Sequence, residues 1–213
     1  MRAASRSIRI AIRDLTGEAD VALRNGVAFG KAEVAQAAPL SFASVTFHDV
    51  REGGQADADV EVVVSAHDDR AMAIALGSGL TRIHTCPLGE WRADAWSVAS
   101  APAASQGTAA RDWHPALTRS GAAQLNARFR DHAGMPMDEA AWRGWMAVKV
   151  AYEAALRARS GEDDILALEF DGYKGLPLRF AEDGHLRQPM FRTAPDARVV
   201  TVPSRLDLGD AFA

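Results

Sequence analysis

The sequence predicts an α/β fold built on a mostly parallel sheet, and two observations support this prediction. Short apolar runs recur along the N-terminal half, at residues 8–14, 41–50, 60–69 and 80–88. Between them, residues 16–39 and 70–77 carry the spacing of helices instead. Strands that alternate with helices in this way are typical of a parallel sheet with helices packed on both of its faces.

Local patterns justify the N-terminal elements in order. Alternating isoleucines predict a first strand that ends near Asp14, and Thr16 is a candidate N-cap for the helix that follows. The apolar face expected for that helix consists of Leu23, Val27, Gly30, Val34 and Ala37. The core residues expected in the second strand are Phe42, Val45 and Phe47. The third strand is nearly continuous in Val, which indicates a strand covered on both faces.

Beyond the fourth strand, residues 97–112 are rich in Ala and Ser without periodicity, and they predict a linker. Helices are expected at residues 115–130 and 140–160, the second with Asp138 as its N-cap and Glu139 in its first turn. The buried face expected for the second helix consists of Trp142, Trp145, Met146, Tyr152 and Leu156. Strand-like LPLRF and LRQPMF on either side of an Asp183-Gly184 turn predict a C-terminal hairpin.

Three motifs in residues 113–189 carry a family resemblance: AAWRGWMAVK, DGYKG and HLRQP. In this order they resemble the C-terminal part of type 1 periplasmic solute-binding proteins. They are most similar to the substrate-binding-like components of PQQ-dependent alcohol dehydrogenase systems. In that family the chain crosses into a second lobe where this sequence has its linker, so the resemblance implies a single Rossmann-like lobe.

The implied organisation has four parts. Residues 1–96 form the N-terminal βαβ part of the lobe, and residues 97–112 replace the second lobe. Residues 113–194 return to complete the same lobe with helices and a hairpin, and residues 195–213 form a tail. The resemblance also implies a periplasmic location. Residues 1–14 lack the apolar centre of a signal peptide, so a leader is expected to have been removed.

Composition and motifs exclude several functions. A net charge of −4 gives no basic footprint, so nucleic acid is not an expected partner. There is no run of 18 apolar residues, so no membrane span is expected. The lone Cys86 cannot form an internal disulfide or a thiolate zinc site. The sequence has no G-x-S-x-G, Gly-rich phosphate loop or H-E-x-x-H motif, which favours a non-enzymatic protein.

Acidic residues follow the ends of four successive predicted strands. Ligands of open parallel sheets bind outside the carboxyl ends of the strands, and hard cations prefer several converging carboxylates. The predicted metal ligands are Asp14, Asp49, Glu52, Asp68, Asp69 and Glu90. A lanthanide or calcium ion is the cofactor that fits them, and the association implied with PQQ dehydrogenases favours the same ions. Asp14 is equally suited to the turn into the first helix, and the position of Asp68 and Asp69 before the next helix favours an N-cap pair over metal ligands.

PQQ or a related organic anion is the alternative ligand, because Arg forks and aromatic faces suit a planar tricarboxylate. The residues predicted for it are Trp91, Arg92, Arg111 and Trp113. The same residues could instead cover the surface beside the missing lobe or form a homodimer contact. Three functions therefore remain open: a metal-binding protein for uptake or delivery, a binder of PQQ, and a ligand-free module that docks on an ABC transporter or dehydrogenase.

Overall fold

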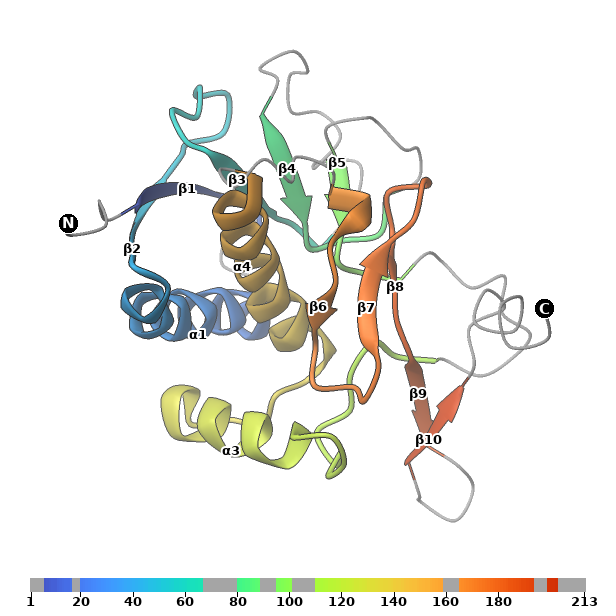
Figure 1. Ribbon diagram of the computed structural model, residues 1–213. Helices are drawn as coiled ribbons and strands as arrows, with labels where there is room; N and C mark the ends of the chain where they lie inside the picture. Colours follow the sequence, from blue (N-terminus) through green and yellow to red (C-terminus); the bar gives the residue numbers. More distant parts are fainter. Residues whose placement is uncertain are drawn as a thin grey trace.

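A computed structural model describes residues 6–16, 20–66, 80–88, 95–100, 110–158, 165–193 and 199–202. Its centre is a five-stranded parallel sheet in the order β2-β1-β3-β4-β5 (Figure 1). The strands are β1 (Arg6–Asp14), β2 (Ala43–Asp49), β3 (Val60–Val64), β4 (Thr81–His84) and β5 (Ala95–Ser97). The four predicted strands are confirmed. The three-residue β5 was not predicted, because so short a segment carries no periodicity of its own.

Helices α1 (Val21–Ala37) and α4 (Glu139–Ala158) pack together over one face of this sheet (Figure 1). Their closest approach uses glycine on both sides. A Cβ added to Gly26 would lie 2.0 Å from the Ala141 carbonyl oxygen, and one added to Gly144 would lie 2.3 Å from that of Leu23. Backbones this close leave no room for a side chain, so the two glycines set the spacing of the helix pair.

The start of α1 corrects the prediction that Thr16 caps it. Asp20 is the N-cap, and its Oδ1 accepts a 3.0 Å hydrogen bond from the Leu23 N–H. Thr16 instead donates to Asp14 Oδ1 from both its N–H and its hydroxyl, at 2.8 and 2.6 Å. The predicted buried face is confirmed except at Ala37, which is exposed at the helix end.

The start of β2 corrects a second prediction, that Phe42 belongs to the core. A 3-10 helix (Ala38–Ser41) continues from α1, and Phe42 ends it in a left-handed conformation with φ of 52°. The Phe42 side chain is therefore turned outward and is 73% exposed. Ala43 takes the buried position, while Val45 and Phe47 are partly buried against the core.

The predicted helix at residues 115–130 begins later than expected, as α3 (Ala122–Ala133). Gly121, with φ of 80°, precedes it in the left-handed conformation that glycine permits. Asn126 holds the preceding turn, because its Nδ2 donates to the carbonyl oxygens of Pro115 and Leu117 at 3.0 and 3.1 Å. Helix α3 packs beside α1 through the edge-to-face pair Phe29–Phe129.

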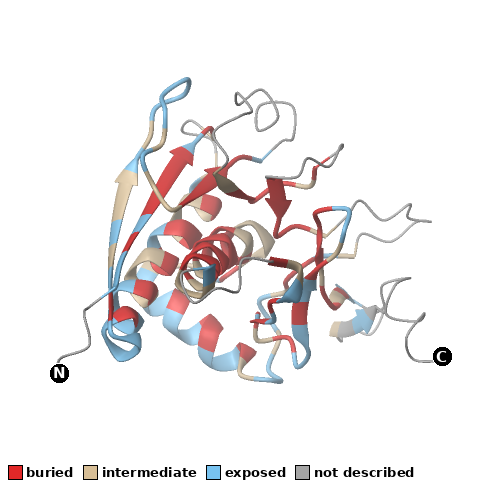
Figure 2. Cartoon of the chain, turned by 45° about the horizontal axis from the view of Figure 1, so that its top comes forward, coloured by how far each residue is buried: buried red, intermediate tan, exposed pale blue. Residues whose placement is uncertain are grey.

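Helix α4 matches its prediction closely. Asp138 caps it, accepting from the Ala141 N–H at 2.9 Å, and Glu139 lies in its first turn. Trp142, Trp145 and Met146 are fully buried, as Figure 2 shows for most of this helix. Among the described helices, α4 included, none is long and apolar enough to span a membrane.

The C-terminal part forms small antiparallel sheets beside β5. Strands β6 (Phe170–Asp171), β7 (Pro177–Phe180) and β8 (Leu186–Arg187) make one, and β9 (Met190–Thr193) pairs with β10 (Val199–Val202). A short 3-10 helix (Ile165–Ala167) precedes them. The hairpin is confirmed, but its second strand is divided at Gln188-Pro189. Strand β10 lies in the predicted tail.

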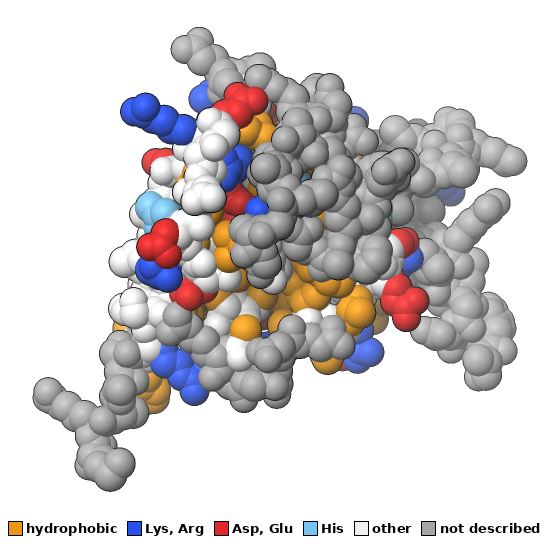
Figure 3. All heavy atoms as spheres, turned by 90° about the horizontal axis from the view of Figure 1, so that it is seen from above, with side chains coloured by type: hydrophobic (Ala, Val, Ile, Leu, Met, Phe, Trp, Pro, Cys, Tyr) orange, Lys and Arg blue, Asp and Glu red, His pale blue; other side chains and the backbone are white. Residues whose placement is uncertain are grey.

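The described surface carries both signs of charge. On the face seen in Figure 3, acidic and basic side chains are interspersed rather than gathered by sign. The predicted helix at residues 70–77 and most of the predicted linker lie outside the described residues.

Candidate binding site

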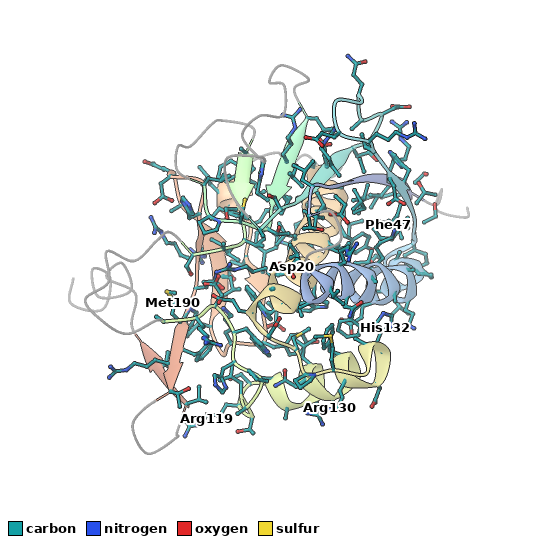
Figure 4. The ribbon with its side chains drawn as sticks, turned by 180° about the vertical axis from the view of Figure 1, so that it is seen from behind. Asp20, Phe47, Arg119, Arg130, His132 and Met190 are labelled. Carbon is teal, nitrogen blue, oxygen red and sulfur yellow. The ribbon has the colours of Figure 1, made fainter. Side chains whose placement is uncertain are left out.

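The carboxyl ends of all five strands lie along one edge of the parallel sheet, which we call the carboxyl edge. From β1 the chain turns to one side for β2 and to the other for β3, so the sheet has a topological switch point at β1. Open α/β sheets bind ligands in the crevice at such a point. Asp20 and Asp138 are the N-caps of α1 and α4, the two helices that pack on the sheet (Figure 4 labels Asp20).

A cavity of about 390 Å³ lies at the β1–β2 end of the carboxyl edge. Its lining residues are Ile12, Asp14, Arg24, Val27, Ala28, Lys31, Asp49, Val50 and Val64. Two predicted metal ligands, Asp14 and Asp49, therefore meet there. Asp49 is 86% exposed and lies 3.9 Å from the Lys31 ammonium, whereas Asp14 accepts both bonds from Thr16 through Oδ1. The cavity thus combines two carboxylates with two cationic side chains.

The other predicted ligands do not complete a metal site among the described residues. Glu52 is exposed in the loop after β2 and is not among the residues that line the cavity. Asp68, Asp69 and Glu90 lie outside the described residues. Within the described ranges, no three His, Cys, Asp or Glu side chains are placed to hold a metal ion.

A buried ion cluster joins β1, β3 and β4. Glu61 on β3 is fully buried and accepts from Arg13 Nε at 2.6 Å and from Arg82 Nε at 3.0 Å. Arg13 also donates to the carbonyl oxygens of Arg51 and Gly54, at 2.6 and 2.8 Å. The cluster therefore fixes the loop that follows Asp49. Sequence reasoning missed it, although a charged residue inside each of three apolar strands was the available signal.

The β4–β5 end of the edge contains a second cluster, in which a buried carboxylate meets two partly buried side chains. Asp112 is fully buried and accepts from Arg143 Nε at 2.6 Å, while Glu139 Oε1 accepts from Arg143 Nη2 and from the Asp112 N–H, both at 2.8 Å. Burial alone would raise the pKa of Asp112. Arg143, Lys174 and the Ser100 N–H outweigh it, so the pKa lies below its usual value.

Lys174 is buried beside this cluster, between aromatic rings. Its ammonium lies 3.8 Å from the centroid of the Trp142 ring, and it donates to Gln188 Oε1 and to the Pro189 carbonyl oxygen. Gln188 in turn donates to the Val98 carbonyl oxygen at 2.8 Å. Burial lowers the pKa of Lys174 to about 7; Asp112 and Glu139 oppose the shift, and Arg143 adds to it.

The residues of the three resemblance motifs therefore contact one another in the structure. Trp142, Lys174 and Gln188, one from each motif, form a single buried stack. Sequence reasoning assigned Lys174 and Gln188 no role, because neither belongs to an apolar pattern. Their contact joins the DGYKG turn to the HLRQP strand and, through Val98, to the end of β5.

The residues predicted to bind PQQ are placed differently from one another. Trp113 is fully buried, stacks on Trp142 with ring centroids 6.0 Å apart, and donates from Nε1 to Asn126. Its faces are therefore used by the core. Arg111 is exposed, and its backbone pairs with Phe191. Trp91 and Arg92 lie outside the described residues.

No known family model matches this sequence, and no curated protein matches it either. Solved structures do match. A possible leucine/isoleucine/valine-binding protein from Rhodopirellula baltica is similar with a TM-score of 0.53 at 8% identity, over 93% of this chain and 97% of that chain.

Two further solved structures are larger than this chain. A branched chain amino acid ABC transporter periplasmic ligand-binding protein from Burkholderia xenovorans matches with a TM-score of 0.34 at 11% identity, over 93% of this chain and 58% of that one. An amino acid ABC transporter substrate-binding protein from Pseudomonas fluorescens matches with a TM-score of 0.34 at 11% identity, over 94% and 59%. This chain has an α/β fold that resembles one lobe of a periplasmic binding protein, with a C-terminal antiparallel hairpin added.

Proposed function

We propose that this protein is a non-enzymatic periplasmic binding protein that takes its ligand at the β1–β2 end of the carboxyl edge. The observation that supports the proposal is the cavity of about 390 Å³ lined by Asp14 and Asp49. It lies beside the switch point of a parallel sheet, where this class of fold binds ligands. The cavity is open to solvent through exposed charged side chains, as a capture site requires.

A hard cation, a lanthanide or calcium, is the ligand we propose first. Both bonds from Thr16 go to Oδ1 of Asp14, which leaves Oδ2 as a potential ligand oxygen in the described part of the chain. Asp49 is held only loosely by Lys31, at 3.9 Å, so a multivalent ion could displace that ammonium. Such ions take six to eight oxygens, and we propose Glu52, Asp68, Asp69 and Glu90 as further contributors.

Terbium titration of chelator-treated protein tests this proposal, with tryptophan excitation and detection of lanthanide emission. We expect saturable emission that lanthanum competes away, and its loss in the Asp14→Asn/Asp49→Asn double variant. Asp57→Asn is the matched control, because Asp57 is a 91% exposed carboxylate that pairs with Arg9 away from the cavity. Absence of both emission and calorimetric heat with terbium and with calcium would exclude metal binding.

A small organic anion such as PQQ is the second candidate, because Arg24 and Lys31 also line the cavity. Two cationic side chains in one concave site can pair with the carboxylates of such a ligand. We expect PQQ binding to weaken in a Lys31→Met variant and to be indifferent to chelators. Quenching of tryptophan fluorescence by PQQ measures it. Equal affinity of wild type and Lys31→Met would place the anion elsewhere, with Arg92 and Arg111 as the residues to test next.

The partners we propose are an ABC transporter and a PQQ-dependent alcohol dehydrogenase. The transporter rests on the fold, which is shared with transporter ligand-binding proteins, and the dehydrogenase on the three sequence motifs alone. If the chain binds neither metal nor PQQ, a ligand-free docking module becomes the best description. Sedimentation of the purified protein mixed with each purified partner distinguishes a ligand-binding protein from a docking module, since a docking module forms a complex without added ligand.

A further inference from the structure

Strand β2 is the outermost described strand of the sheet. It pairs with β1 along its whole length, from Arg6–Ala43 to Ile12–Asp49, and with no other described strand. In Figure 2 it is tan and pale blue where its inner neighbours are red, and Figure 4 places Phe47 at the margin of the molecule. Ser44 and Thr46 are exposed. Among the described residues, one side of this strand is therefore unpaired.

The hydrogen bonds to β1 show which backbone groups face outward. The Val50 N–H donates to the Ile12 carbonyl oxygen at 2.8 Å, and the Phe42 carbonyl oxygen accepts from the Arg6 N–H at 3.0 Å. Even-numbered residues thus direct their backbone groups to β1. Because backbone groups alternate along a strand, the N–H and C=O groups of Ala43, Val45, Phe47 and Asp49 point away from the sheet.

Most of the devices that usually block an open edge are missing from β2, whose one acidic residue, Asp49, stands at its last position. It runs for seven residues, ASVTFHD, without proline, lysine or a break in its register. Natural edge strands are normally short, bulged or guarded by such residues. Two exposed apolar side chains, Leu40 at 84% and Phe42 at 73%, lie directly before it. An edge of this kind is suited to pair with another strand.

We propose that β2 pairs antiparallel with β2 of a second copy, about a two-fold axis through Thr46. This is the register in which all seven residues pair, and it sets each outward-facing residue opposite another, Ala43 with Asp49 and Val45 with Phe47. Val45–Phe47 is an aromatic and β-branched pair, and Thr46 meets Thr46; both are favourable cross-strand pairs. The two five-stranded sheets become one continuous sheet.

The pairing also extends the candidate binding site. In this register Phe42 comes opposite the partner's Val50, and Val50 lines the cavity that contains Asp14 and Asp49. Each copy thus brings a phenyl ring, exposed in the isolated chain, to the rim of the other copy's cavity. The dimer itself does not depend on the proposed ligand, so each proposal can fail alone.

Introducing a charge at Thr46, on the two-fold axis, tests the register. We expect light scattering to give twice the monomer mass for the wild type, and the monomer mass for Thr46→Lys and for Thr46→Glu, because like charges then meet at the axis. An equimolar mixture of the two variants should regain the dimer mass. A monomeric wild type at millimolar concentration, or a Thr46→Lys variant that stays dimeric, would overturn the proposal.

Cross-linking supplies a second test that does not rely on disrupting the edge. Residues facing each other without mutual hydrogen bonds have Cα atoms about 4.5 Å apart, within reach of a disulfide. Thr46→Cys should therefore form a covalent dimer on mild oxidation. Ser44→Cys is the matched control, because its two copies would lie about 14 Å apart. Equal cross-linking of both variants, or none in Thr46→Cys, contradicts the register. Cys86 is buried and stays out of the reaction.

Discussion

The two ends of the carboxyl edge hold carboxylates in opposite states. At the β1–β2 end, Asp49 is 86% exposed and its nearest cation is 3.9 Å away. At the β4–β5 end, Asp112 is fully buried and receives hydrogen bonds from Arg143 and the Ser100 N–H. A carboxylate that is saturated by its own protein stabilises the fold, whereas one that is exposed and loosely paired is available to a ligand. The same residue type therefore stabilises the fold at one end and, in the function that we propose, receives the ligand at the other.

The largest loss of stability is expected for a substitution at the buried β4–β5 end, and it tests whether the carboxylate there is structural. Asp112→Ala leaves the partly buried Arg143 guanidinium with Glu139 as its described partner, so we expect the free energy of unfolding to fall by about 3 kcal/mol. Urea denaturation measures it. Asp112→Asn is the milder comparison, because it keeps the shape and loses the charge. A loss below about 1 kcal/mol for Asp112→Ala would show that the cluster is not structural.

The second largest loss of stability is expected at the contact between α1 and α4. Helices α1 and α4 pack against each other near their N-termini, where a Cβ added to Gly144 would lie 2.3 Å from the Leu23 carbonyl oxygen. Gly144→Ala should cost about 1–3 kcal/mol by overpacking, despite the higher helix propensity of alanine. Thermal unfolding measures this loss. Gly134→Ala cannot serve as the control, because Gly134 has a positive φ that alanine would strain. Unchanged or raised stability would mean that the helices separate at little cost.

The buried end should also give the molecule a pH dependence. The pKa of Lys174 is about 7 in the folded state against 10.5 for an ordinary lysine, so between these values the unfolded chain binds more protons. Its destabilising contribution is therefore full below pH 7 and is relieved as the pH rises to 10.5, by about 1.4 kcal/mol per pH unit.

Urea unfolding of wild type and Lys174→Met from pH 6 to 9.5 isolates this dependence. The stability of the wild type should rise relative to the variant across that range. Parallel profiles would show that Lys174 keeps its proton in the folded state, held by Gln188 and the Trp142 ring.

The smallest effect on stability is expected at the open end. Asp14→Asn and Asp49→Asn should each change the free energy of unfolding by no more than about 0.5 kcal/mol, because exposed and weakly paired charges contribute little. Chemical denaturation without added ligand measures this. A larger loss at Asp49 would make its contact with Lys31 structural and would weaken the case for a capture site.

Much of the fold could be predicted because its main elements are buried and periodic. Strand β3 is continuous in valine, and α4 carries both a capping aspartate and a tryptophan face. Errors arose where the outcome depended on local competition. Thr16 was an acceptable cap, but Asp14 takes its hydroxyl, and Asp20 replaces it. Phe42 was apolar enough for the core, but its left-handed backbone turns it outward.

The site was predictable only in part, for a related reason. The rule that parallel strands end at one edge was enough to bring Asp14 and Asp49 to a common cavity. It could not place Glu52, which belongs to a loop whose path is set by the buried side chain of Arg13. Nor could it reveal the bond between Asp112 and Arg143, since 31 residues separate them and no local pattern connects them.

The position of α4 has a consequence for how the chain acquires its structure during synthesis. Strands β1, β3 and β4 all pack against this helix, yet it comes from residues 139–158, well after the last strand of the parallel sheet. A chain emerging from the ribosome or a translocon therefore displays Ile10, Val62 and Ile83 to water until α4 has followed them. During that interval the exposed apolar face of the nascent sheet is prone to aggregation, so the sheet can be covered by its own chain only after α4 has been synthesised.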